Sequence, residues 1–146
     1  MKTTDTLIIG ASIAGLASAG SLKKEGVDYL IIERHKEIVS PWRNHYDRLH
    51  LHTNKKLSTL PYKKFDANVP TYPTKQQVVD YMVDYQKEFD IQPDFETEAK
   101  SVKKVDDSWL VETNKGTYKA KTVIVATGPF GRPREIDFKG SCSWFW

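Results

Sequence analysis

The fold of this chain is decided by the stretch Leu7-Ile8-Ile9-Gly10-Ala11-Ser12-Ile13-Ala14-Gly15. Three apolar residues run into a glycine, and a second glycine follows among small side chains. Gly10 stands where a strand must reverse sharply, which favours a residue that tolerates a positive φ. Gly15 falls on the inner face of the helix that follows, where a missing side chain lets helix and strand approach closely. The stretch therefore predicts a strand, a tight turn and a helix.

A second apolar run, Tyr29-Leu30-Ile31-Ile32, ends at the acid Glu33. Glu33 lies 18 positions after Gly15, close to the spacing of about 20 at which a dinucleotide-binding βαβ unit places its ribose-binding acid. The turn can aim backbone N–H groups and a helix N-terminus at a pyrophosphate. Its candidate ligand-binding residues are Gly10, Ala11, Ser12, Ile13, Ala14 and Gly15. Because an acid repels a 2′-phosphate, FAD or NAD is expected here and NADP is disfavoured.

Ser12 occupies the position that usually carries the middle glycine of this turn. Its Cβ should push the pyrophosphate slightly outward. Alternatively, its hydroxyl can donate a hydrogen bond to a phosphate oxygen. Both interpretations remain open from the sequence.

Size and composition argue against several classes of protein. The 146 residues make one domain with 39% hydrophobic residues, and a formal net charge of +3 is too small to indicate a nucleic-acid partner. No run approaches about 18 consecutive apolar residues, so no membrane span is expected, and no signal peptide is visible. A single cysteine, Cys142, argues against a disulfide or dithiol centre, and the four histidines lack metal-ligand spacing. A cytoplasmic setting without a metal is expected.

Two helices are predicted from capping and periodicity. Residues 13–25 form the first, with Gly26 as its C-terminal cap. Residues 74–89 form the second, because Thr74 and Gln77 make a capping box before an apolar stripe at helical spacing. Between them, residues 34–70 are predicted to be irregular with short extended pieces.

Strand signals dominate the remainder of the chain. Residues 48–52 alternate between apolar and polar, as in a half-buried strand. Three short strands, at 98–105, 109–113 and 117–120, predict a small antiparallel meander, and residues 122–126 predict a separate buried parallel strand. This order of elements predicts an α/β fold: a doubly wound, Rossmann-like, FAD/NAD(P)-binding domain with a β-meander insert.

The amino-terminal unit resembles the extended FAD fingerprint. Gly10, Gly15, Ala19, Gly26 and Glu33 all fall at its spacings. Further segments resemble flavin-containing monooxygenases, most closely the plant YUCCA-like branch and its bacterial relatives. These segments are Trp42-Arg43, Tyr46-Asp47-Arg48-Leu49-His50-Leu51-His52, Tyr72-Pro73-Thr74-Lys75-Gln76-Gln77, Ala126-Thr127-Gly128 and Arg132-Pro133.

The resemblance implies FAD bound at the glycine turn, with Glu33 on the adenosine ribose. Arg34, Trp42 and Arg43 would lie along the ribityl–pyrophosphate stretch. Aromatic residues of this kind more often belong to a core than to a cofactor site, so Trp42 is the only aromatic nominated.

The resemblance also places residues at the two ends of the cofactor. The backbone of Ala99 would meet the adenine edge, and Thr127 and Gly128 would pack near the pyrophosphate. A short strand at 50–53 would pass the isoalloxazine ring and bring His52 to the flavin's oxygen adduct as the candidate catalytic residue. The alternative is that His50 and His52 simply face solvent from an edge strand.

In the family, NADPH reduces the flavin, oxygen adds to it, and one oxygen atom passes to a small organic substrate. The flavin itself carries out the redox and oxygen chemistry. This accounts for the absence from the sequence of a set of catalytic side chains like that of a hydrolase. The family continues with a phenylalanine–glycine–histidine–tyrosine signature and a second glycine turn for NADPH, and neither is present in these 146 residues.

We therefore expect residues 1–140 to be the incomplete FAD-binding part and residues 141–146 to be an aberrant tail. The NADPH-binding domain would be absent, and the chain alone would have little or no turnover. A natural terminal strand is the alternative for the tail. The oligomeric state is not indicated by any pattern.

Three other functions fit parts of the sequence. An NAD-binding module or small dehydrogenase would use the same turn, but the long loop and the meander are unusual for one. A flavin disulfide reductase shares the fold but needs a pair of thiols. A non-catalytic nucleotide-binding fragment would retain FAD without turnover.

Overall fold

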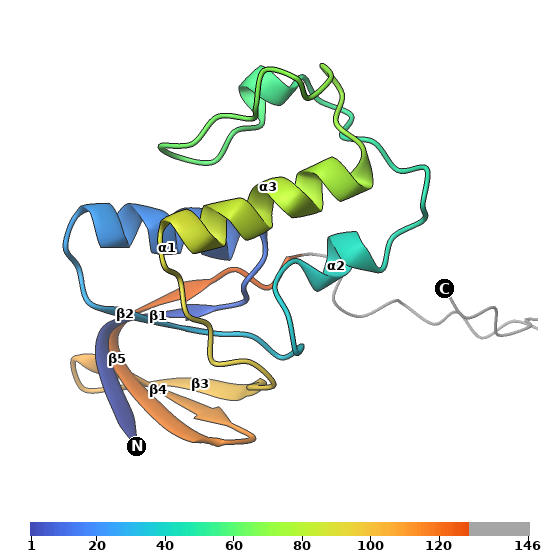
Figure 1. Cartoon of the computed structure of the whole chain (residues 1–146). Coiled ribbons are helices and arrows are strands. Elements are labelled where there is room, and N and C mark those ends of the chain that lie inside the picture. Colours follow the sequence, from blue (N-terminus) through green and yellow to red (C-terminus); the bar gives the residue numbers. More distant parts are fainter. Residues whose placement is uncertain (129–146) are drawn as a thin grey trace, which may run out of the picture.

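A computed structural model of the chain describes residues 1–128 and shows a layered arrangement (Figure 1). Helices α1 (Ile13–Lys24) and α3 (Lys75–Glu88) lie side by side over one face of the parallel strands. Two short helical turns, α2 (Ser40–Arg43) and η1 (Lys55–Leu57), interrupt the long connection before α3. No helix in the described part is long and apolar enough to cross a membrane.

The strands form one five-stranded sheet in the order β2-β1-β5-β4-β3. β1 (Lys2–Ile9) pairs in parallel with β2 (Tyr29–Ile32) and with β5 (Gly116–Val125). β4 (Ser108–Thr113) and β3 (Ala99–Val105) extend the sheet beyond β5 in antiparallel pairing. This confirms the predicted α/β, Rossmann-like class with a β-meander.

The register brings the ends of the parallel strands to one level. Ile9, the last residue of β1, pairs with Ile32 and with Val125. The segments that follow the three strands therefore leave the sheet at the same edge. In open α/β sheets, ligands bind outside this carboxyl edge.

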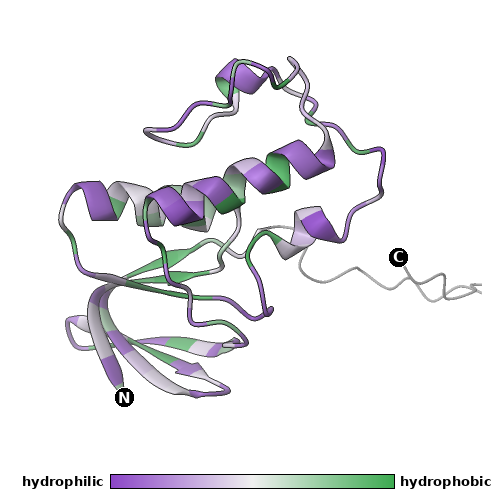
Figure 2. Cartoon of the chain, in the orientation of Figure 1, coloured by the Kyte–Doolittle hydropathy of each residue, from purple (hydrophilic) through white to green (hydrophobic). Residues whose placement is uncertain are grey.

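Alternation along the strands divides the core between the two faces of the sheet. On one face, Ile8 and Ile31 pack with Leu16 of α1 and with Val78 and Tyr85 of α3. On the other face lies a cluster formed by Leu7, Ile9, Ile32, Val111, Tyr118 and Ala120. Figure 2 shows the apolar residues concentrated on the parallel strands and the inner side of the helices. The meander thus packs against part of the face that the helices leave open.

Both predicted helices are present, and their ends follow the expected chemistry. α1 ends before Gly26, whose φ is +68°. α3 begins after Thr74, whose hydroxyl accepts from the Gln77 N–H while the Gln77 side chain accepts from the Thr74 N–H. This is the predicted capping box.

The prediction of two separate strands at 117–120 and 122–126 is wrong, because β5 runs without a break from Gly116 to Val125. No turn residue interrupts it at Lys121, so one long strand pairs with β4 through its first half and with β1 along its length. The expectation that residues 122–126 are buried also fails, since Val125 is 68% exposed. The helices cover only one face of the sheet, and no part of residues 1–128 covers Val125.

The predicted strand at 48–52, and with it the strand at 50–53, is not formed; only an isolated bridge joins His50 to Thr74. The alternation itself persists, because Leu49 is buried and His50 is exposed. The backbone here pairs with the segment before α3 through irregular bonds, such as Leu51 N–H to Pro73 O at 2.7 Å. Predictions that concern Arg132-Pro133, the domain end near residue 140 and the tail at 141–146 lie outside the described residues.

Candidate functional site

The glycine turn is packed too closely for side chains. Gly10 has φ +107°, and its N–H donates to Ile32 O at 2.8 Å. A Cβ on Gly10 would lie 2.6 Å from Ala126 O, and one on Gly15 would lie 1.9 Å from Gly10 O. Gly10 is therefore enclosed by the ends of β2 and β5 and by the start of α1. Real Cβ atoms do not tolerate such distances, so the turn requires both glycines.

The start of α1 has the properties of an anion site. Ser12 is its N-cap, but the Ser12 hydroxyl makes no capping bond, and no acidic residue lies in the first turn. The first N–H groups of a helix have no intrahelical acceptor, and the helix dipole is positive there. N–H groups of this kind can bind an anion such as a pyrophosphate.

Glu33 lies directly after β2 and is only 8% exposed. Its Oε2 accepts from the Ala11 N–H at 2.7 Å, and its Oε1 accepts from the His35 N–H at 3.0 Å. Each carboxylate oxygen has two lone pairs, so acceptor capacity remains for ribose hydroxyls. Sequence reasoning placed Glu33 at this edge but did not foresee its bonds to the backbone.

The segment after Glu33 is anchored onto the turn by Val39. The Val39 N–H donates to Ala11 O at 3.1 Å, and Val39 adopts the left-handed conformation with φ 53°. Nothing in the sequence signals this, since valine is a rare choice there. Pro41 in the first turn of α2 was the available signal for that short helix.

The two residues nominated in α2 differ in their surroundings. Trp42 is half-buried and packs against the helical side of the core. The Nε of Arg43 donates to Ile38 O at 3.2 Å and lies 3.1 Å from the Glu37 carboxylate. Through Nε, Arg43 therefore stabilises its own loop beside the turn.

Other nominated residues lie around the same edge. Thr127 follows β5, with its Cα 3.4 Å from the position of a Cβ on Gly10, and Gly128 has φ +70°. Ala99 opens β3 two residues after Thr97, whose N–H donates to the backbone O of Glu33 at 2.8 Å. Arg34 is exposed, and its Nε donates to the His35 ring at 3.1 Å. The fold thus gathers them at the ends of β1, β2 and β5.

His52 is exposed, whereas its neighbour Leu51 faces inward. Leu51 and Ile13 line a cavity of about 320 Å³ that reaches Val78 and Met82 on the inner side of α3. Residues 51 and 52 therefore adjoin the start of α1. His52 stands at the surface of this region, consistent with either of the two interpretations from the sequence.

The long connection before α3 is held in place by two lysines, Lys55 and Lys75. The ammonium of Lys55 donates to three backbone carbonyls between residues 66 and 69. Lys75 donates to His45 O and to the Asp47 carboxylate, both within 2.9 Å. The hydrogen bond from Lys75 lowers the pKa of Asp47. These contacts define the loop that carries His52.

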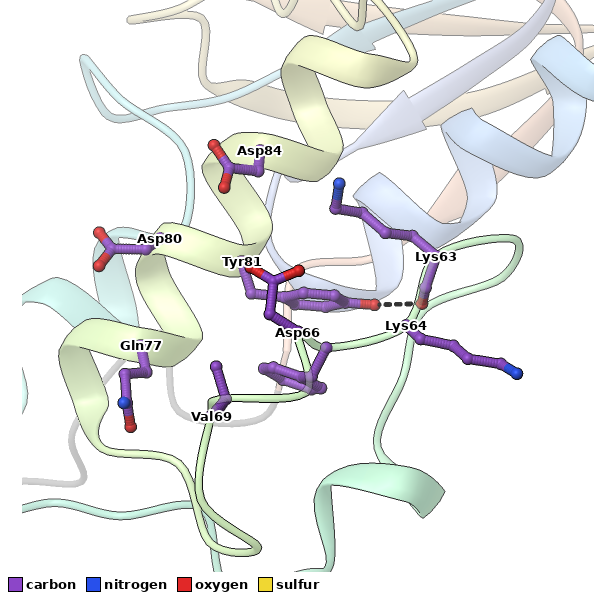
Figure 3. Close-up of a pocket in the computed structure, with 9 residues that line it drawn as sticks. Lys63, Lys64, Asp66, Val69, Gln77, Asp80, Tyr81 and Asp84 are labelled. Atoms are coloured by element: carbon purple, nitrogen blue, oxygen red, sulfur yellow. Dashed lines mark hydrogen bonds between the residues drawn. The ribbon is translucent and has the colours of Figure 1, made fainter.

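A second hollow, of about 200 Å³, lies between this loop and α3 (Figure 3). Asp80 and Asp84 extend from α3 at its rim, and the Tyr81 hydroxyl donates to Lys63 O at 2.8 Å. Tyr81 also accepts from the Leu60 N–H and stacks on Phe65, so it anchors the loop. In the described part of the chain, no group of three His, Cys, Asp or Glu side chains is placed to hold a metal ion.

Parallel strands with a glycine turn, a helix N-terminus and a buried acid at one edge are the features of the Rossmann-like, dinucleotide-binding fold class. The chain belongs to the pyridine nucleotide-disulphide oxidoreductase family, whose model matches residues 7–144. Its relatives include YUCCA flavin monooxygenases and CzcO-like oxidoreductases, which confirms the resemblance stated from the sequence.

Two curated relatives illustrate the match. A CzcO-like oxidoreductase of Geobacillus kaustophilus is 40% identical over 139 residues, covering 95% of this chain and 40% of the relative. The indole-3-pyruvate monooxygenase YUCCA6 of Arabidopsis thaliana is 39% identical over 145 residues, covering 94% of this chain and 34% of the relative. The chain thus spans well under half the length of these proteins.

Among solved structures, the flavin-containing monooxygenase of Stenotrophomonas maltophilia superposes with a TM-score of 0.85 at 23% identity. The match covers 96% of this chain and 43% of that one. At this identity the likeness shows the fold alone.

Proposed function

We propose that the chain is the FAD-binding portion of an NADPH-dependent flavin monooxygenase that oxygenates a small organic substrate. The observation that carries the proposal is the convergence of the glycine turn, the start of α1 and the Glu33 carboxylate at the carboxyl edge of the parallel strands. The flavin monooxygenases among the chain's relatives support a flavin as the cofactor.

Each end of the cofactor would meet a different part of the edge. The N–H groups at the start of α1 would hold the pyrophosphate, with Thr127 and Gly128 beside it. Glu33 would accept from the adenosine ribose hydroxyls, and the Ala99 backbone would face the adenine. Both carboxylate oxygens of Glu33 keep a free lone pair for this, because each has a single backbone donor.

The flavin end would lie toward α2 and the loop that carries His52. Trp42 would exclude water there, and Arg34 and Arg43 would contribute positive charge along the pyrophosphate and ribityl chain. His52 would donate or accept a proton at the exposed edge of the ring. When bound, the flavin supplies the redox and oxygen chemistry, and the protein orients it and shields it from water.

We propose further that these 146 residues bind FAD without turning over NADPH by themselves. The chain contains one glycine turn of the dinucleotide type, at residues 10–15. A mixture of the chain with FAD, NADPH and a thioether or amine is expected to yield no oxygenated product. Product formation coupled to NADPH oxidation would contradict this part of the proposal.

Calorimetric titration with FAD tests the proposed cofactor directly. The chain should bind FAD more tightly than NAD. Glu33→Ala should weaken FAD binding about 10- to 100-fold, because hydrogen bonds to a charged group contribute about 1.5–3 kcal/mol. Glu25→Ala, an exposed acid at the end of α1, is the control and should leave the affinity unchanged. Tighter binding of NAD than of FAD would favour the alternative of an NAD-binding module. A folded chain that does not bind FAD would refute the proposal.

A further inference from the structure

The backbone of Ala11, in the middle of the turn, is held on both sides by one segment. Its N–H donates to the Glu33 carboxylate at 2.7 Å, and its carbonyl accepts from the Val39 N–H at 3.1 Å. Ala11 is fully buried, so these bonds lie away from water. The segment 33–39 therefore holds the turn in place by hydrogen bonds that need no ligand.

The Glu33 carboxylate holds two parts of the backbone together by hydrogen bonds. It is nearly buried, and its two oxygens take N–H groups from different parts of the chain, Ala11 in the turn and His35 after β2. A buried carboxylate is unfavourable unless it is hydrogen-bonded, and charge-assisted bonds of this length are strong. Glu33 thus links the turn to the end of β2 through its side chain.

Val39 shows that this arrangement is imposed by its surroundings. It is buried among the helical core and holds φ 53°, a conformation that β-branched residues rarely adopt. Such strain persists only where neighbouring contacts determine the backbone, and it clusters at ligand sites. Here the determining contacts are the Val39 N–H on Ala11 O and the Trp42 N–H on Val39 O at 2.9 Å.

We propose that Glu33 is a positioning residue for the phosphate-binding turn as well as a ribose ligand. By holding the Ala11 N–H, its carboxylate sets the direction in which the following N–H groups at the start of α1 face the pyrophosphate. The ligand part of this inference rests on the proposed function. The hydrogen bond to Ala11 can be tested without any ligand.

Binding of ADP and of 2′,3′-dideoxy-ADP separates the two roles, because the second ligand lacks the ribose hydroxyls. Glu33→Gln keeps the size of the side chain but replaces one acceptor oxygen with an NH₂ group, which cannot accept from an amide N–H. We expect this variant to bind dideoxy-ADP about two- to tenfold more weakly than the unchanged chain, the loss of roughly one net hydrogen bond. Equal binding of dideoxy-ADP by both proteins would show that Glu33 acts through the ribose alone and would overturn the proposal.

Amide hydrogen exchange in the ligand-free chain supplies the second readout. In Glu33→Gln, exchange at Ala11 or His35 should accelerate at least about tenfold, because a charge-assisted bond is lost. The Thr97 N–H is the internal control, since it donates to the backbone O of Glu33 and not to its side chain. Unchanged exchange at both amides would refute the positioning role.

If Glu33→Gln does not fold, Glu33→Asp serves the same test, because it keeps the charge and shortens the reach to Ala11. In this variant, hydrogen exchange at the Ala11 amide should be faster, and exchange at the Thr97 amide should be unchanged. Should neither ADP nor FAD bind the unchanged chain, the proposed function fails, whereas the exchange result still decides whether Glu33 fastens the turn. The two failures are therefore distinguishable.

Discussion

At the residue scale, Gly20 of α1 packs against Tyr85 of α3. A Cβ on Gly20 would lie 2.1 Å from the Tyr85 hydroxyl oxygen. Tyr85 is fully buried, and its hydroxyl has no hydrogen-bond partner among residues 1–128. Gly20 is thus a packing residue, and Tyr85 is accommodated at the cost of an unpaired polar atom.

A double-mutant cycle tests this contact. Gly20→Ala should lower the free energy of unfolding by about 1–3 kcal/mol through overpacking. Tyr85→Phe should be neutral or stabilising, because it removes an unpaired buried hydroxyl. In the double variant, Phe should recover part of the loss, since the nearest clashing atom is gone. Chemical denaturation measures all three, and strict additivity would contradict the contact.

The same cycle has a pH signature. Burial raises the pKa of Tyr85 from 10.0 to about 12. Between pH 10 and 12 the folded chain then binds more protons than the unfolded chain, so stability falls as the pH rises through that window, by up to about 2–3 kcal/mol. Tyr85→Phe should flatten this alkaline decline relative to the unchanged chain.

At the scale of elements, the two long helices begin differently. α3 has a complete capping box at Thr74 and Gln77, whereas the hydroxyl of Ser12 makes no capping bond at α1. A helix that starts without a side-chain cap leaves its N–H groups for another acceptor. This difference supports the proposal that the start of α1, and not that of α3, faces the cofactor.

Paired alanine substitutions test that difference. Thr74→Ala should cost about 1 kcal/mol of stability, the usual loss of a capping residue. Ser12→Ala should change stability little, and it should weaken FAD binding if the hydroxyl donates to a phosphate oxygen. Thermal unfolding and FAD titration of both variants provide the measurements. A larger stability loss for Ser12→Ala than for Thr74→Ala would contradict the assignment.

At the scale of the whole molecule, the two faces of the sheet are covered unequally. The helices cover one face and the meander covers much of the other, but Val125, near the end of β5, remains 68% exposed. An apolar side chain exposed on the uncovered part of a sheet face can contact other chains.

Val125→Thr should therefore slow aggregation while changing stability by no more than about 0.5 kcal/mol, as is usual at exposed sites. Val111→Thr is the matched control at a fully buried position of the same sheet. It should cost about 1–3 kcal/mol, because it buries a hydroxyl. Light scattering and denaturation separate the two effects; an equal stability loss in both variants would refute the assigned burial.

Much of the fold could be predicted because its signals are local. The glycine turn, the capping box before α3 and the acid at the end of β2 each depend on a few neighbouring residues. The continuity of β5 and the exposure of Val125 could not be predicted, because they depend on which strands and helices lie beside them. The absent strand at 48–52 has the same cause: its partner is the segment before α3.

The sequence by itself determined that a strand, a turn without side chains and a helix follow one another, and that an acid comes after the second strand. Only the tertiary structure decided what that acid touches. Ala11 and Glu33 are 22 positions apart, and Val39 reaches Ala11 only because β1 and β2 end at the same level. Spacing specifies local conformation, whereas hydrogen bonds between distant residues depend on how the strands are aligned.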